Sequence, residues 1–144
     1  MKIKKEQIKI YCIITLGMNI ASIVLGLLHY IIGLNIVFGI MLSIILAIAW
    51  VLNIGLLILN DFKIVKSNPI GKKLNLLGYG FIGFQIIAIF TLAGGIFLLN
   101  ADWTTPLVQY LLIGTGFFGY FIYGSLLSYI NIKKVEIREV WKFE

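Results

Sequence analysis

Long, uninterrupted apolar segments dominate the chain. No Asp, Glu, Lys or Arg occurs over residues 10–60, and a helix needs about 20 apolar residues to cross the hydrocarbon core of a bilayer. This segment is long enough for two crossings. Its break is expected at Gly33 and Asn35, the turn-forming residues near its middle. The pattern therefore predicts a first membrane helix over residues 10–32 and a second over 36–59.

The second half of the chain repeats this arrangement. A polar connector over residues 61–73 is followed by apolar segments over 74–99 and 107–130, each long enough for one crossing. Pro106 precedes the last segment, where proline suits the first turn of a helix. The tail, 132–144, alternates apolar and charged residues without a clean period, so it either prolongs the last helix or lies at the membrane interface.

Composition agrees with this pattern and excludes a soluble globular domain. Apolar residues make up 60% of the 144 residues and charged residues only 12%, whereas soluble domains carry about a quarter charged residues. The predicted fold class is all-α: a polytopic membrane protein whose residues 1–144 form a single four-helix transmembrane bundle.

The positive charges predict the orientation of this bundle. A four-span topology places every Lys and Arg on one side of the membrane, and the other side then carries only Asp102 as a charged residue. Short segments rich in Lys and Arg stay in the cytoplasm, so both termini are expected inside, with the plasma membrane as the default compartment. The charge of +6 is then explained by topology and anionic lipid headgroups rather than by nucleic acid. Candidate contacts to inner lipid or to a partner are Lys63, Lys66, Lys72, Lys73 and Trp141.

Glycine patterns favour close helix packing over nucleotide binding. The segments that begin at Gly78 and Gly114 both match G-x-G-x-x-G, but that motif binds a dinucleotide only between a strand and a helix, and here both copies lie inside apolar spans. Small residues let membrane helices approach closely. The small residues expected to pack helices are Gly26, Gly39, Ser43, Gly80, Gly83, Gly116 and Gly124.

Uncharged polar residues inside the predicted spans form the candidate functional site. In the first span they recur at spacings of three and four residues, which puts them on one face of a helix. Two interpretations are open: the side chains line a solute path, or they form hydrogen bonds between helices. The residues concerned are Thr15, Asn19, Ser22 and His29 in the first span and Asn53, Gln85 and Gln109 in the others.

Candidate catalytic and metal chemistry is sparse. A single cysteine and a single histidine exclude an internal disulfide and a Cys/His zinc site. No Asp, Glu, Lys or Arg lies within a predicted span, which disfavours ion-coupled transport. His29 and Asp102 fall near the outer ends of their helices, where a pH-responsive pair or part of a triad with Thr104 or Thr105 is conceivable. A histidine held at the interface is the simpler interpretation, because no nucleophile motif accompanies it.

Two hypotheses for function follow. The leading one is a non-catalytic membrane subunit or regulatory interaction protein, without cofactor or metal, that acts through helix packing and its basic cytoplasmic face. Its expected partners are membrane lipids and either another membrane protein or further copies of the chain. The alternative is a homo-oligomeric pore or passive carrier for a small solute or ion, lined by the uncharged polar residues.

Overall fold

In the computed structural model, the described part of the chain is helical apart from short turns. Three long helices account for most of it: α1 (Lys5–Ile32), α3 (Pro69–Leu98) and α4 (Pro106–Val140). The residues that the structure describes are 5–33, 39, 41, 44–45, 47–55, 69–99, 101, 103 and 105–140.

The helix ends follow from local backbone chemistry. Both α3 and α4 begin with a proline, Pro69 and Pro106, whose fixed φ and missing N–H suit the first helical position. Helix α1 ends at Ile32 and is followed by Gly33, which has φ +69° and whose backbone N–H donates to the carbonyl of His29 at 2.8 Å. This left-handed residue closes the last turn of the helix, a conformation that glycine adopts without steric cost.

All three helices are long and apolar enough to cross a membrane. They contain 28, 30 and 35 residues and are therefore between about 42 and about 52 Å long at 1.5 Å per residue. The prediction of an all-α membrane protein is thus confirmed. The second predicted span, 36–59, lies partly outside the described residues, and its longest described stretch, 47–55, is helical.

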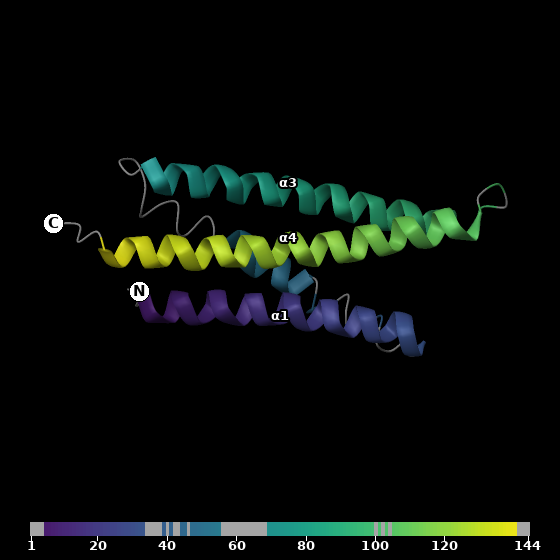
Figure 1. Ribbon diagram of the computed structural model, residues 1–144, viewed down its shortest axis with the longest axis horizontal. Helices are drawn as coiled ribbons and strands as arrows, with labels where there is room; N and C mark the ends of the chain where they lie inside the picture. Colours follow the sequence, from purple (N-terminus) through teal and green to yellow (C-terminus); the bar gives the residue numbers. More distant parts are fainter. Residues whose placement is uncertain are drawn as a thin grey trace.

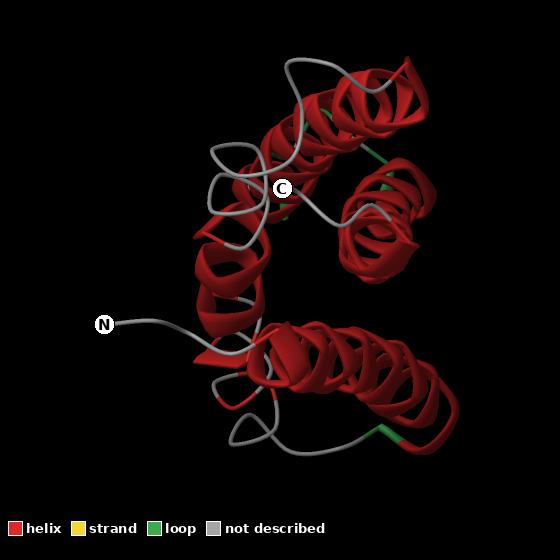
Figure 2. Ribbon diagram, turned by 90° about the vertical axis from the view of Figure 1, so that its left-hand side faces the viewer, coloured by secondary structure: helices red, strands yellow, loops and turns green. Residues whose placement is uncertain are grey.

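Helix α4 is the central element of the bundle. Figure 1 shows α1 and α3 running in the same direction on either side of α4, which runs in the opposite direction and contacts both. The backbones of α1 and α3 do not approach each other. Figure 2, which looks along the long helices, shows a further short helical segment between α1 and α3, and Asn53 of the helical residues 47–55 bonds to α4. The first residues of α1 and the last residues of α4 lie at the same end of the molecule.

Close packing between α3 and α4 depends on glycines. A Cβ added at Gly116 would lie 2.5 Å from the backbone nitrogen of Leu92 and 2.8 Å from the carbonyl oxygen of Ala88. A Cβ at Gly95 would lie 2.9 Å from the backbone nitrogen of Ile113. The two backbones therefore meet without intervening side chains, the arrangement that dispersion contacts favour in lipid.

The glycines expected to pack helices divide into two groups. Gly26, Gly116 and Gly124 lie against neighbouring helices, whereas an added Cβ at Gly39, Gly80 or Gly83 would meet no atom within 4 Å. Among the described residues, none lies within 4 Å of a Cβ built at Gly80 or Gly83, and Ser43 lies outside the described residues.

The geometry of α3 explains this difference. Its buried residues include Gly71, Gly78 and Gln85, which repeat at seven-residue intervals, close to two helical turns. Gly80 and Gly83 are each two residues away from this face, roughly 200° around the helix. Helix α3 consequently has two stripes of small residues, one against α4 and one directed outward.

Replacing Gly116 by leucine is expected to lower the free energy of unfolding by about 1–3 kcal/mol, because the new side chain collides with backbone atoms of α3. Thermal unfolding in detergent, followed by circular dichroism, measures this change. Gly114→Leu is the matched control, since a Cβ at Gly114 meets nothing within 4 Å. An unchanged midpoint for Gly116→Leu would contradict the close approach of α3 and α4.

Candidate functional site

A cluster of buried polar side chains lies where the helices converge on Gly124 of α4. It comprises Asn19 of α1, Asn53 of the helical residues 47–55, Gln85 of α3, and Ser128 and Asn131 of α4, none of which is exposed at all. We call these five side chains and Gly124 the amide cluster. Burial of so many amides inside an apolar bundle requires that they bond to protein groups.

Helix α1 contributes its polar face to the interior. Thr15, Asn19 and Ser22 are fully buried and recur at intervals of four and three residues, so they share one face. Each also donates to the backbone of its own helix: Thr15 Oγ1 to the carbonyl of Cys12 at 2.8 Å, Asn19 Nδ2 to that of Thr15 at 2.7 Å, and Ser22 Oγ to that of Met18 at 2.8 Å. The donors of this face are thus satisfied locally, which reduces the cost of placing them in lipid.

Asn53 connects its helical segment to α4 through three hydrogen bonds. Ser128 Oγ donates to Asn53 Oδ1 at 2.7 Å, Asn53 Nδ2 donates to the carbonyl of Gly124 at 3.4 Å, and Asn131 Nδ2 donates to the carbonyl of Asn53 at 3.4 Å. Ser128 Oγ also lies 3.0 Å from the Gly124 carbonyl. The side chain and the backbone of Asn53 are therefore both bound to α4.

Gln85 makes the corresponding contact from α3. Its Nε2 donates to the carbonyl of Tyr120 at 3.3 Å. The same Nε2 lies 2.9 Å from the position of a Cβ built on Gly124, and Asn19 Oδ1 lies closer still to that position. Side chains from α1 and α3 therefore meet over Gly124, and only the absence of a side chain there makes room for both.

Some polar atoms of the cluster have no hydrogen-bond partner among the described residues. The buried oxygens Asn19 Oδ1, Gln85 Oε1 and Asn131 Oδ1 lack a donor there, and the buried Trp50 Nε1 lacks an acceptor. None of the five side chains is ionisable at neutral pH. The arrangement can hold helices together and bind a small polar molecule, but it supplies no acid, base or nucleophile among the described residues.

Four predicted site residues lie outside the amide cluster: Thr15 and Ser22 on the buried face of α1, and Gln109 and His29 elsewhere. Gln109 is 8% exposed, and its Nε2 donates to the carbonyl of Leu98 at 2.7 Å, which ties the start of α4 to the end of α3. His29 is exposed on the last turn of α1. Its suggested pairing with Asp102 and Thr104 falls outside the described residues, and Thr105 is exposed.

The basic residues of the described helices collect at one end of the bundle. Lys9 lies in the first turns of α1, Lys72 and Lys73 in the first turn of α3, and Lys133 near the end of α4, and these helix ends coincide in Figure 1. Lys72 and Lys73 are exposed, as a contact with lipid headgroups requires. The other predicted inner contacts, Lys63, Lys66 and Trp141, lie outside the described residues.

Lys134 differs from these exposed lysines. Its side chain is completely buried, next to the small apolar cluster of Ile8, Cys12 and Val135 where α1 meets α4. The sequence suggested only a place among the basic residues that follow the last span. Lys134 is buried because α4 continues to Val140 and keeps this position on the side that faces α1. The sequence did not predict this burial, since its pattern left open whether residues 132–144 prolong the helix.

Ser128 and Asn131 were also missed as members of a site. Their only signal was spacing: with Gly124 they recur at intervals of four and three residues, the same periodicity as the polar face of α1. In the described part of the chain, no group of three or more His, Cys, Asp or Glu residues could hold a metal ion.

One comparison with known proteins gives a match, and it is confined to the end of the chain. The family model for ISK channels, described as slow voltage-gated potassium channels, matches residues 101–139, which contain nearly all of α4. No curated protein and no solved structure matches the chain. The similarity to that channel family therefore concerns one membrane helix and the residues just before it.

Replacing Asn53 by leucine is expected to lower the free energy of unfolding by about 1–2 kcal/mol, because interhelical hydrogen bonds in membrane proteins contribute about 0.6 kcal/mol each. Equilibrium unfolding in mixed micelles measures this loss. Thr91→Val is the control, since Thr91 Oγ1 bonds only within its own helix, to the carbonyl of Ile87 at 2.9 Å. Equal stability of the two variants would show that the amide cluster does not hold the bundle together.

Proposed function

We propose that the chain is a non-catalytic integral membrane subunit that regulates or supports another membrane protein by direct helix contact. The observation that carries this proposal is the outward stripe of small residues on α3: Gly80, Gly83 and Gly94. No described residue lies within 4 Å of a Cβ built at these glycines, and small residues on a helix surface are typical of helix contacts between membrane segments.

The shape of this stripe suits a second helix. A Cβ at any of the three glycines would meet no atom within 4 Å. Ile87 and Phe90 lie on the same face of α3, between Gly83 and Gly94 at intervals of three and four residues, and they are 60% and 72% exposed. A partner helix that packs on this face would contact the glycine backbone and bury both side chains.

The family match supports the same class of function. It falls on α4, in a family described as slow voltage-gated potassium channels, so the proposed partner is a membrane protein and a channel is the first candidate. Within this proposal α4 organises the subunit while α3 presents the outward stripe. A regulatory membrane subunit needs no catalytic group, which agrees with the uncharged character of the amide cluster.

We further propose that the chain crosses the membrane four times with both termini inside. Helix α1 ends and α3 begins at opposite ends of the bundle (Figure 1), so the chain between them has to return across its full length. The lysines at one end of the described helices support a cytoplasmic position for that end. The exposed Lys72 and Lys73 would then contact anionic headgroups.

The alternative of a homo-oligomeric pore has less support. It requires the polar face of α1 to line an axis shared between copies of the chain. Thr15, Asn19 and Ser22 are instead fully buried within the chain, and Asn53 and Gln85 bond to α4. A pore between copies would need other residues for its lining.

Replacing Gly83 by leucine is expected to abolish co-purification of the partner protein, because the new side chain holds the partner helix away from the backbone of α3. Quantitative mass spectrometry after mild-detergent purification from native membranes measures the loss. Gly17→Leu serves as the control, since Gly17 is an exposed α1 glycine with no atom within 4 Å of an added Cβ. If the partner co-purifies in undiminished amount with both Gly83→Leu and Gly17→Leu, the outward stripe is not the contact surface.

The orientation is tested by cysteine labelling in a Cys12→Ser background, which removes the chain's one cysteine. Trp103→Cys, at a position that is 80% exposed between α3 and α4, is expected to react with an impermeant maleimide added to intact cells. Lys73→Cys is expected to react only after lysis. The reverse labelling pattern would invert the proposed topology.

A further inference from the structure

A crevice separates the halves of α1 and α4 that lie away from the lysine end. The two helices are in close contact at Gly26, where a built Cβ would lie 2.9 Å from Cζ of Phe117. Beyond this contact they diverge toward the end of the bundle that carries His29 (Figure 1). The resulting cavity measures about 800 Å³, within the range of about 300–1,000 Å³ that small-molecule sites occupy.

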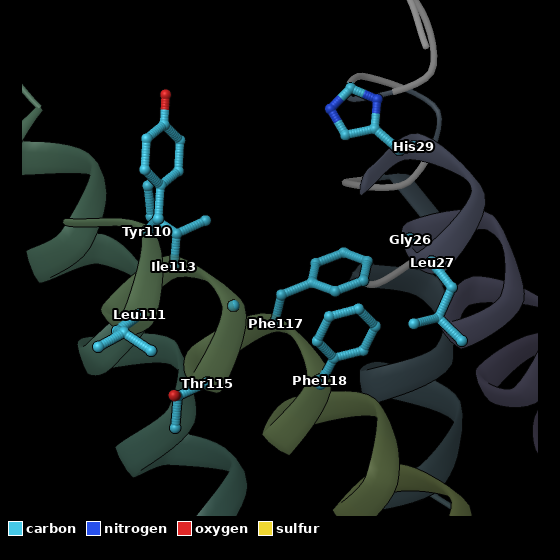
Figure 3. A pocket seen from close by; sticks show the side chains of 10 residues that line it. Gly26, Leu27, His29, Tyr110, Leu111, Ile113, Thr115, Phe117 and Phe118 are labelled. Carbon is cyan, nitrogen blue, oxygen red and sulfur yellow. The ribbon is translucent and has the colours of Figure 1, made fainter. Parts of the chain in front are cut away.

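The lining of the crevice is apolar at its base and polar at its mouth. Phe117 and Phe118 project from α4 toward α1 and close the base, and Leu27 and Ile113 form part of the walls (Figure 3). His29 and Tyr110 lie on opposite sides of the mouth. Tyr110 and Phe117 are seven residues apart on α4, so the crevice is about 10 Å deep.

This distribution of polarity matches an amphiphile. We propose that the crevice binds a membrane glycerophospholipid, with part of an acyl chain between α1 and α4 and its ester or phosphate oxygens accepting hydrogen bonds from His29 and Tyr110. Both helices are of membrane-spanning character, so the open side of the crevice faces lipid. Aromatic and histidine side chains with polar tips are suited to the headgroup boundary.

The geometry favours a lipid over a second helix. A helix with its side chains is about 10–12 Å across, whereas the base of the crevice narrows to the contact between Gly26 and Phe117. All Lys and Arg residues lie in other parts of the sequence, so hydrogen bonding rather than charge selects the headgroup. Phosphatidylglycerol and phosphatidylethanolamine are therefore expected to bind comparably. The inference concerns α1 and α4 and does not depend on the outward stripe of α3.

The test uses the full chain in nanodiscs that contain phosphatidylglycerol with a diazirine near the end of one acyl chain. After irradiation, mass spectrometry locates the lipid adducts. Adducts at Leu27, Phe117 and Phe118 are expected to exceed those at the exposed Phe90 of α3. Gly114→Phe adds a ring to the crevice wall, at a position where a Cβ meets nothing within 4 Å, and it is expected to lower the crevice adducts about tenfold by displacing several methylene groups.

Gly17→Phe is the matched control, since it adds the same ring to an open position of α1 away from the crevice, and it is expected to leave the adducts unchanged. If Gly114→Phe fails to fold, Thr115→Trp on the crevice wall replaces it. Removing both donors with His29→Phe and Tyr110→Phe is expected to lower adduct yield about fivefold. Uniform labelling of all lipid-facing surfaces, adducts that Gly114→Phe leaves unchanged, or a chain dimer with unlabelled crevice residues would each overturn the proposal.

Discussion

The helices of the bundle converge on Gly124, where α4 carries no side chain. At this position Asn19 from α1 and Gln85 from α3 come together on α4, and the carbonyl of Gly124 accepts a hydrogen bond from Asn53. A side chain at this position would displace the amide groups of Asn19 and Gln85 from the places they occupy. In a bilayer the hydrophobic effect does not drive helices together, so close approach and interhelical hydrogen bonds have to supply the stability. One glycine provides both at the same point.

This constraint explains why the chain is polar inside and apolar outside. The hydrogen bonds of the amide cluster contribute only about 0.6 kcal/mol each, so their main effect is on register: Asn53, Gln85 and Asn19 find partners only when each helix has the correct rotation and depth. Large apolar side chains such as Ile87, Phe90 and Leu111 face outward. We propose membrane ligands for two features of this exterior: a partner helix for the outward stripe of α3 and a lipid for the crevice between α1 and α4.

The periodicity of the sequence predicted which side chains of the first helix are buried. It could not predict which face of one helix packs against which other helix. Spacings of three and four residues placed Thr15, Asn19 and Ser22 on one face of the first helix, and these side chains are buried. The same spacing extended the face to His29, which is exposed because α1 and α4 diverge beyond the contact of Gly26 with Phe117. On α3 two small stripes were present, and composition alone does not show which of them contacts α4. Residues 132–144 show no regular pattern, so the sequence did not indicate how far the last helix extends. In the structure α4 continues to Val140, and Lys134 is therefore part of the helix and buried.

The most direct test of this account is a solid-state NMR measurement on the chain in lipid bilayers. With ¹⁵N in the asparagine side chains and ¹³C in the glycine carbonyls, the account predicts a cross-peak between Nδ2 of Asn53 and the carbonyl of Gly124, which lie close because Nδ2 donates to that carbonyl oxygen at 3.4 Å. The peak should disappear in Asn53→Leu, which also assigns it. A folded, helical protein that shows no such contact would contradict the convergence of the helices on Gly124.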